Sequence, residues 1–307
     1  MAKSISQTLV DLSIYCNDDY DKILQFIQQK AKAPEEFVKK MNINYSNITT
    51  LLDETYPYVF KKTYKPPLVL YSNYNDLNIL NEKLLNKRRN KIAILGSNFD
   101  FGSGKTEPCL SDYEQAVIEG MLNDLSKTEN KENITIIGFL ENEASRWSLY
   151  FAHALGLDIV AYSLKDRSTV LSDHCIFDSV DNSKESNNKA TDDKNKNTRV
   201  FLTEHSQPNQ NKEVSLKDAV FTAFRICGMS DTLVLTGASN KQKDLYEPFI
   251  KYISESKELL VVPQPITNKV DTLCNDLIYE GATIYNGVNS ISKIENIIKS
   301  KDRDIEL

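Results

Sequence analysis

The sequence has little of what marks membrane proteins, secreted scaffolds or metal centres. It has no run of about 20 uninterrupted apolar residues, the length that a helix needs to cross a bilayer, and its N-terminus lacks the apolar core of a signal peptide. Its five cysteines are scattered and form no C-x-x-C pair, which argues against a disulfide framework and a zinc site. We therefore expect a protein of the reduced cytoplasm that holds no metal or cofactor.

Residue types for catalysis are also scarce. Only three histidines occur, His153, His174 and His205, and no serine elbow or third partner accompanies them. His153 belongs to an aromatic helical pattern, and His174 with its neighbour Cys175 gives too few ligands to indicate a metal site. We expect no enzymatic activity. The net charge of −6 argues against tight, non-specific binding of DNA, which usually needs a basic field.

What is present from residue 91 onward is an alternation of short apolar runs and helical patterns. Such alternation indicates an α/β fold with a parallel sheet and right-handed crossovers. The predicted strands are 92–95, 134–137, 158–162, 199–203, 232–235 and 259–262. Five helices are predicted between and after these strands. One begins at a capping box formed by Ser111 and Glu114, and one contains Trp147 and ends at Gly156. The other three span residues 216–227 (capped by Ser215), 241–255 and 270–280.

Two domains are predicted. Residues 1–62 form a small helical module in which no strand is expected, with Ser4 and Gln7 as a capping box, Asp19 as a second cap and Pro34 in a third helix. Residues 63–300 form the sheet domain. The polar stretch at about 181–198 is predicted to be a disordered insertion, because it has too little apolar content to offset the entropy of ordering.

The most informative motif is the apolar run Ile92–Leu95, which ends at Gly96 and Ser97. Ligands of open α/β sheets bind outside the carboxyl ends of the strands, where small residues let a phosphate approach the backbone. A glycine loop follows and contains Lys105, but Phe99 stands where a P-loop needs its first glycine. The motif therefore predicts a binding site at this turn and not an ATP site.

An ordered series of further segments resembles the DNA-processing protein A family (DprA, or Smf). The resemblance covers roughly residues 50–295. Its segments are Leu51–Pro57, Lys65–Leu70, Ile92–Ser97, Val200–Glu204, Gly228–Val234, Val261–Pro263 and Asn275–Thr283. It implies an extended Rossmann-like sheet, often dimeric and without hydrolytic activity, that binds single-stranded DNA and loads the recombinase RecA during DNA uptake.

The resemblance also implies the DNA contacts. They are Gly96, Ser97, Asn98, Lys105, Arg225 and Gly228, with Arg88 and Arg89 as further sources of charge. Asn98 stands where the family turn has arginine, and Arg225 lies one residue beyond the aligned arginine segment. Because bidentate arginine contacts bind phosphate most strongly, a weakened pocket is expected. Two alternatives stay open: a scaffold that acts through protein contacts, and a nucleotide-binding enzyme.

Overall fold

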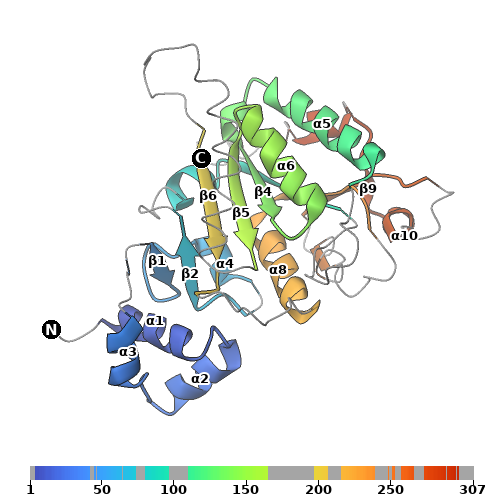
Figure 1. Ribbon diagram of the computed structural model, residues 1–307. Coiled ribbons are helices and arrows are strands. Elements are labelled where there is room, and N and C mark those ends of the chain that lie inside the picture. Colours follow the sequence, from blue (N-terminus) through green and yellow to red (C-terminus); the bar gives the residue numbers. More distant parts are fainter. Residues whose placement is uncertain are drawn as a thin grey trace, which may run out of the picture.

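The fold is described from a computed structural model of the 307-residue chain. The described residues are 4–41, 45, 47–63, 65–73, 80–96, 110–164, 197–206, 216–238, 248, 251–252, 257–265, 273–287, 289–294 and 296. Within them, three N-terminal helices lie beside a domain in which helices cover both faces of a twisted sheet (Figure 1). No helix of these segments has the length and hydrophobicity of a membrane-crossing segment.

The N-terminal helices begin where the sequence predicts. Helix α1 (Ile5–Tyr15) has Ser4 and Gln7 as a reciprocal capping box, and Asp19 caps α2 (Tyr20–Gln28) through the N–H of Lys22. Helix α3 (Glu35–Met41) starts just after Pro34, where the missing N–H of proline costs nothing. These helices bury a cluster of their own apolar residues against the first strands of the sheet, which ties them to the rest of the chain.

Nine strands form one sheet in the described part of the chain. Their order is β1-β2-β6-β5-β4-β3-β7-β8-β9. The pairs β1–β2 and β2–β6 are antiparallel, and the other six pairs are parallel. The strands are β1 (Ile48–Thr50), β2 (Val69–Ser72), β3 (Asn90–Leu95), β4 (Ile134–Phe139), β5 (Asp158–Ser163), β6 (Arg199–Thr203), β7 (Thr232–Leu235), β8 (Glu258–Val261) and β9 (Thr283–Ile284). The predicted α/β class and all six predicted strands are confirmed.

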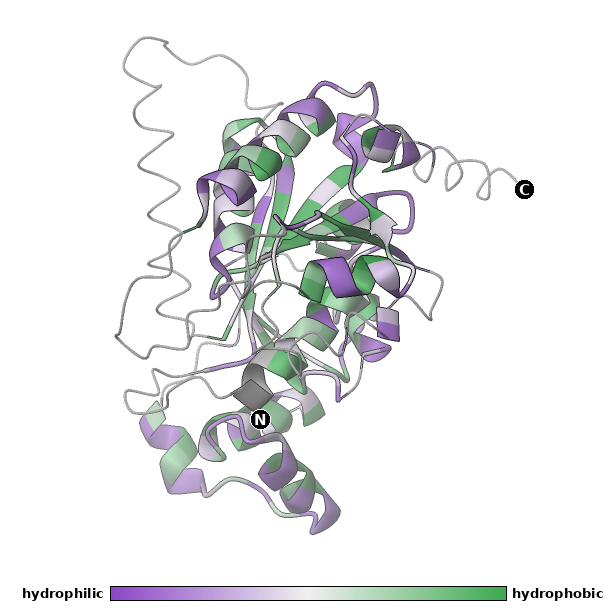
Figure 2. Cartoon of the chain, turned by 90° about the vertical axis from the view of Figure 1, so that its right-hand side faces the viewer, coloured by the Kyte–Doolittle hydropathy of each residue, from purple (hydrophilic) through white to green (hydrophobic). Residues whose placement is uncertain are grey.

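The two faces of the sheet bury different helices because side chains alternate along a strand. Ile92 and Ile94 of β3 pack under α5 (Asp112–Ser126) and α6 (Glu143–Ala154), which lie side by side in Figure 1. Ala93 and Leu95 face the opposite core. That core also contains residues of α4 (Tyr58–Lys61), the π-helical turn Leu80–Leu84, α8 (Leu216–Met229) and α10 (Leu273–Tyr279). Figure 2 shows the apolar strands enclosed between helices with polar outer surfaces.

The expectation that residues 1–62 contain no strand is wrong. Strand β1 lies in this segment and pairs with β2, Thr49 opposite Leu70. Three β-branched residues are too few to show a period of two, but they suit an edge position next to an existing strand. The predicted caps at Ser111 and Gly156 are confirmed, the latter with a φ of 80°. A short 3-10 turn, η2 (Lys131–Asn133), precedes β4.

Other sequence expectations lie partly outside the described residues. These are the cap Ser215, most of helix 241–255 and residues 181–196 of the predicted insertion. The last two residues of that insertion are described and bond to the sheet: Thr198 donates its N–H to Asp158, and Asn197 donates to the Leu157 carbonyl. The insertion itself remains a prediction, and these two residues at its end are ordered against their neighbours.

Candidate functional site

The direction in which successive strands are added to the sheet changes between the parallel neighbours β3 and β7. The chain proceeds from β3 to β4 on one side, and from β7 to β8 on the other. In open α/β sheets this switch point is where ligands bind, because the loops after the two strands diverge there. Gly96 follows β3, and Thr236 follows β7 with its N–H donated to the Leu95 carbonyl at 2.8 Å. Gly96, which the sequence predicted as part of a binding site, therefore lies at the switch point of the sheet.

Asn142 fixes the backbone of Gly96. The Gly96 N–H donates to Asn142 Oδ1 at 3.0 Å, and Asn142 Nδ2 donates to the Gly96 carbonyl at 2.8 Å. The same Oδ1 accepts the N–H of Ser145 and so caps α6. Because both bonds are buried, each contributes about 1 kcal/mol. The amide of Gly96 is thus held within the fold in this structure.

Side chains fill the space on the other side of Gly96. A Cβ built at this glycine would lie 2.5 Å from Ala144 Cβ, 2.9 Å from Glu114 Oε1 and 3.2 Å from Thr236 Oγ1. Glu114 is buried at the start of α5, where its carboxylate accepts the Ser111 hydroxyl at 3.0 Å. The described surroundings of Gly96 therefore include a carboxylate among the three nearest side chains.

The sequence also predicted Ser97, Asn98 and Lys105 as contacts. All three lie outside the described residues. They remain predicted contacts.

Arg225 lies in a different place, inside a buried polar cluster on α8. Its Nη2 donates to Glu204 Oε2 at 2.7 Å, just after β6, and to the carbonyl of Lys65 at 3.4 Å. Burial alone would lower the pKa of Arg225, but Glu204 raises it above its ordinary value. Burial and the same carboxylate raise the pKa of Tyr162. The guanidinium therefore stays charged with only 4% of its side chain exposed.

Gly228 allows α8 to approach the segment after α4 closely. A Cβ at this position would lie 2.2 Å from Thr63 Cγ2 and 3.6 Å from the carbonyl oxygen of Val59. The residue is thus a close-packing position between α8 and this segment. Its predicted contact with DNA remains a prediction.

Among the described residues, the structure does not bring the predicted contacts Gly96 and Arg225 into one pocket. Gly96 contacts residues of α5, α6 and the end of β7, whereas Arg225 contacts residues around the end of β6. Strands β4 and β5 separate β3 from β6, which amounts to about 14 Å at 4.8 Å per strand. A single phosphate cannot bridge both groups.

The hypothesis that Arg89 supplies charge to the pocket is wrong. Its Nη1 donates to Asp158 Oδ2 at 2.6 Å, with 6% of the side chain exposed, and its Nη2 donates to the carbonyl of Glu132. The neighbouring Lys91 pairs with Asp231 at 2.9 Å. These two cations tie the amino ends of strands together and are not offered to a ligand.

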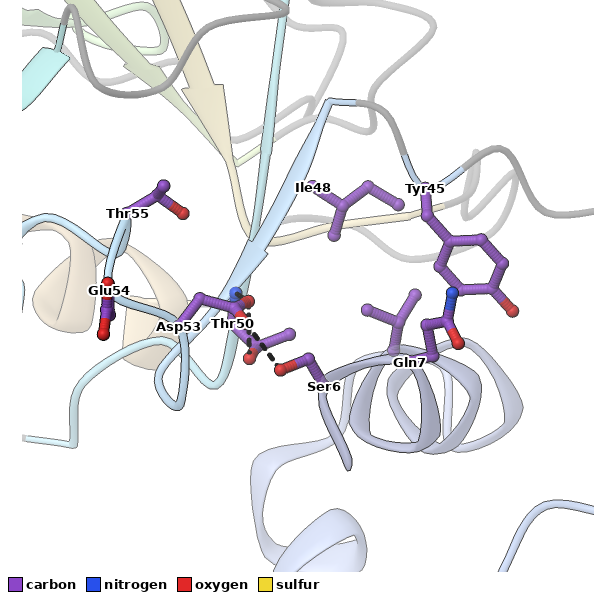
Figure 3. Close-up of a pocket in the computed structure, with 9 residues that line it drawn as sticks. Ser6, Gln7, Tyr45, Ile48, Thr50, Asp53, Glu54 and Thr55 are labelled. Carbon is purple, nitrogen blue, oxygen red and sulfur yellow. Dashed lines mark hydrogen bonds between the residues drawn. The ribbon is translucent and has the colours of Figure 1, made fainter. Parts of the chain in front are cut away.

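A hollow of about 410 Å³ lies elsewhere, between α1 and β1. Figure 3 shows Ser6 of α1 facing Asp53 and Thr50, and Gln7 beside Tyr45. Ser6 donates to the Asp53 carboxylate at 2.5 Å. Asp53 also accepts the N–H of Thr50 at 2.7 Å, and Glu54 lines the same hollow. Its carboxylates make this hollow unsuited to a polyanion. Across the described segments, no group of three metal-ligating side chains converges.

Comparison with known proteins gives a fold. No protein-family model matches the sequence, and no curated protein matches it either. Among solved structures, DNA processing protein A from Streptococcus pneumoniae has a TM-score of 0.59 and 13% identity, covering 94% of this chain and 91% of that one. The protein of the same name from Helicobacter pylori has a TM-score of 0.51 and 18% identity, covering 84% and 96%. The resemblance in sequence is confirmed at the level of structure: this chain has the fold of DNA processing protein A.

Proposed function

We propose that this protein binds single-stranded DNA and acts in DNA processing. The observation that carries the proposal is the shared fold over most of the chain with two DNA processing proteins, of which the Helicobacter pylori protein binds single-stranded DNA. The sequence segments that resemble the DNA-processing protein A family also support this proposal. Binding is expected to depend on phosphate contacts and on stacking of bases, with little preference for sequence.

In this proposal the loop after β3 supplies part of the contact. Ser97, Asn98 and Lys105 would approach the phosphates, and Gly96 would position the loop through Asn142. Arg225, which the fold buries against Glu204, and Gly228, which packs on Thr63, stay predicted contacts and carry no part of this argument. Because Glu114 places a carboxylate beside Gly96, affinity at this turn is expected to be weak.

The finer parts of the role are proposals too. We infer that the protein works in the cytoplasm, is not an enzyme, forms a homodimer and passes its DNA to the recombinase RecA. Sedimentation of the protein alone, and of a mixture with DNA and RecA, tests the dimer and the hand-over.

Fluorescence anisotropy with a labelled oligo-dT tests the proposal directly. We expect saturable binding at 50 mM salt that weakens by about tenfold or more at 200 mM, because binding releases condensed counterions. An unlabelled oligonucleotide must compete with the probe. No saturable binding at low salt would contradict the proposed function.

A scaffold that has kept the fold and acts through protein contacts is the second candidate. The filled space at Gly96 favours it, since Ala144, Glu114 and Thr236 occupy the side toward which a Cβ would point. This candidate predicts a stable complex with another protein and no affinity for DNA. The same filling counts against a nucleotide-binding enzyme at the switch point.

A further inference from the structure

A surface rich in lysine and tyrosine lies on α4 and the segment after it. Lys61 and Lys62 are both exposed, and Tyr58 has 56% of its surface exposed. The segment is held in place from below, because Phe60 is fully buried in the core and Thr63 packs on α8 at Gly228. The exposed side chains are therefore presented from a fixed backbone.

The cations of this surface lie over aromatic rings. Lys62 Nζ is 4.8 Å from the centroid of the Tyr58 ring, and Lys65 Nζ is 5.4 Å from that of Tyr20 and 5.7 Å from that of Phe221. Alternating lysine and aromatic side chains form the kind of platform on which single-stranded nucleic acid binds. The ammonium groups follow the phosphates while rings stack on bases of any sequence.

Lysines act on Tyr58 although the whole chain is acidic, with a net charge of −6. A hydrogen bond with Lys62 and the charges of Lys62 and Lys87 lower the pKa of the Tyr58 phenol below its ordinary value. Lys65 also forms an ion pair with Asp21 at 3.1 Å, which neutralises one of the charges. The corner at Gly96 has the opposite character, because Glu114 lies against it.

We propose that the lysine–tyrosine surface, formed by Tyr58, Lys61, Lys62 and Lys87 and followed along the chain by the ion-paired Lys65, is a binding surface for single-stranded DNA in this protein. The inference rests on the proposed function and adds the place at which the strand lies. The lysines contact successive phosphates, and the ring of Tyr58 stacks on a base. This surface lies on α4 and its neighbours, apart from the switch point after β3.

Charge reversal with a matched control tests the lysines. The variant Lys61→Glu with Lys62→Glu changes the net charge as much as Lys39→Glu with Lys40→Glu does, and the latter pair is exposed on α3. In oligo-dT anisotropy at low salt, we expect the first variant to lose about tenfold or more in affinity. The dependence of log K on log salt should flatten by about 1.4, since each phosphate contact on a single strand contributes about 0.7. The α3 variant should bind like the wild type.

Stacking is tested with Tyr58 and with the ligand. Tyr58→Ala should weaken oligo-dT binding about fivefold or more, whereas Tyr58→Phe should keep the affinity because the ring remains. An oligomer of the same charge without bases should bind equally to Tyr58→Ala and the wild type. A duplex of equal length should bind more weakly than the single strand.

The outcomes separate the two proposals. If the wild type does not bind oligo-dT, the proposed function fails. If the wild type binds and the α4 variant binds as well as the α3 variant, with melting temperatures unchanged, the surface is refuted and the function stands. If the melting temperature of the α4 variant is lowered, the double variant Lys62→Glu with Lys87→Glu takes its place in the binding assay. Equal binding of the duplex and the single strand would refute stacking on Tyr58.

Discussion

Replacing Gly96 by alanine should destabilise the protein by forcing α6 away from the sheet. The new Cβ would lie 2.5 Å from Ala144 Cβ, a contact that must open by about an ångström to become ordinary. Ala144 cannot rotate away because its Cβ is fixed to the helix backbone. The helix itself is held to Gly96 by the two bonds from Asn142.

The magnitude follows from overpacking. Adding a carbon to a filled core costs about 1–3 kcal/mol, and losing the extra freedom of glycine in the unfolded chain returns about 0.5 kcal/mol. We expect the free energy of unfolding to fall by about 2 kcal/mol. With a slope of about 3 kcal/mol per molar urea, the midpoint should fall by about 0.7 M.

Two companion variants make the measurement specific. Gly120→Ala lies on the exposed side of α5 with nothing within 4 Å of the added carbon, so it should stabilise by about 0.5–1 kcal/mol. Ala144→Gly removes the clashing carbon and should recover part of the loss in the Gly96→Ala background. An unchanged midpoint for Gly96→Ala, or strict additivity of the Gly96 and Ala144 changes, would refute the reasoning.

Two further changes test the polar contacts. Glu204→Gln leaves the charge of Arg225 buried without its carboxylate and should lower the free energy of unfolding in urea by about 3 kcal/mol. The control Glu258→Gln, at the more exposed pair with Lys293, should lower it by less than about 1 kcal/mol. Equal losses for the two variants would contradict this reasoning. Burial raises the pKa of Asp18, against the opposing effect of His205 and the bonds from Ser206, so folding favours the protonated acid and stability falls as pH rises. Asp18→Asn should therefore gain stability relative to the wild type as the pH rises above about 4, where an ordinary aspartate ionises, and a difference that does not change with pH would exclude this linkage.

Most of the sheet could be predicted from the sequence because its signals are local. The run Ile92–Leu95 is apolar throughout and bounded by Gly96, and Ser111 with Glu114 marks the start of α5 within four residues. Strands β1 and β9 were missed. They have three and two residues, and only pairing with a neighbouring strand makes them strands.

The candidate site was less predictable because its contacts join distant parts of the chain. Glu114 was predicted as a helix cap, but its position against Gly96 depends on where α5 packs. Arg89 belongs to a run of charges that reads as solvated, and its partner Asp158 lies 69 residues away. A pattern in sequence shows that a charge exists, and only the fold shows whether another residue has already neutralised it.

Strand β1 has a consequence for the N-terminal segment as a whole. It covers the outer side of β2, where Leu51 donates its N–H to the Leu68 carbonyl and Ser72 donates to the Asn47 carbonyl. In a chain shortened to start at residue 63, these backbone groups of Leu68 and Ser72 would lose their hydrogen-bond partners. Strand β2 would then be an edge strand, unpaired on this side, to which a second molecule can add a strand of its own. The first 62 residues thus cover the edge of β2 and leave the three-residue β1 as the margin on this side of the described sheet.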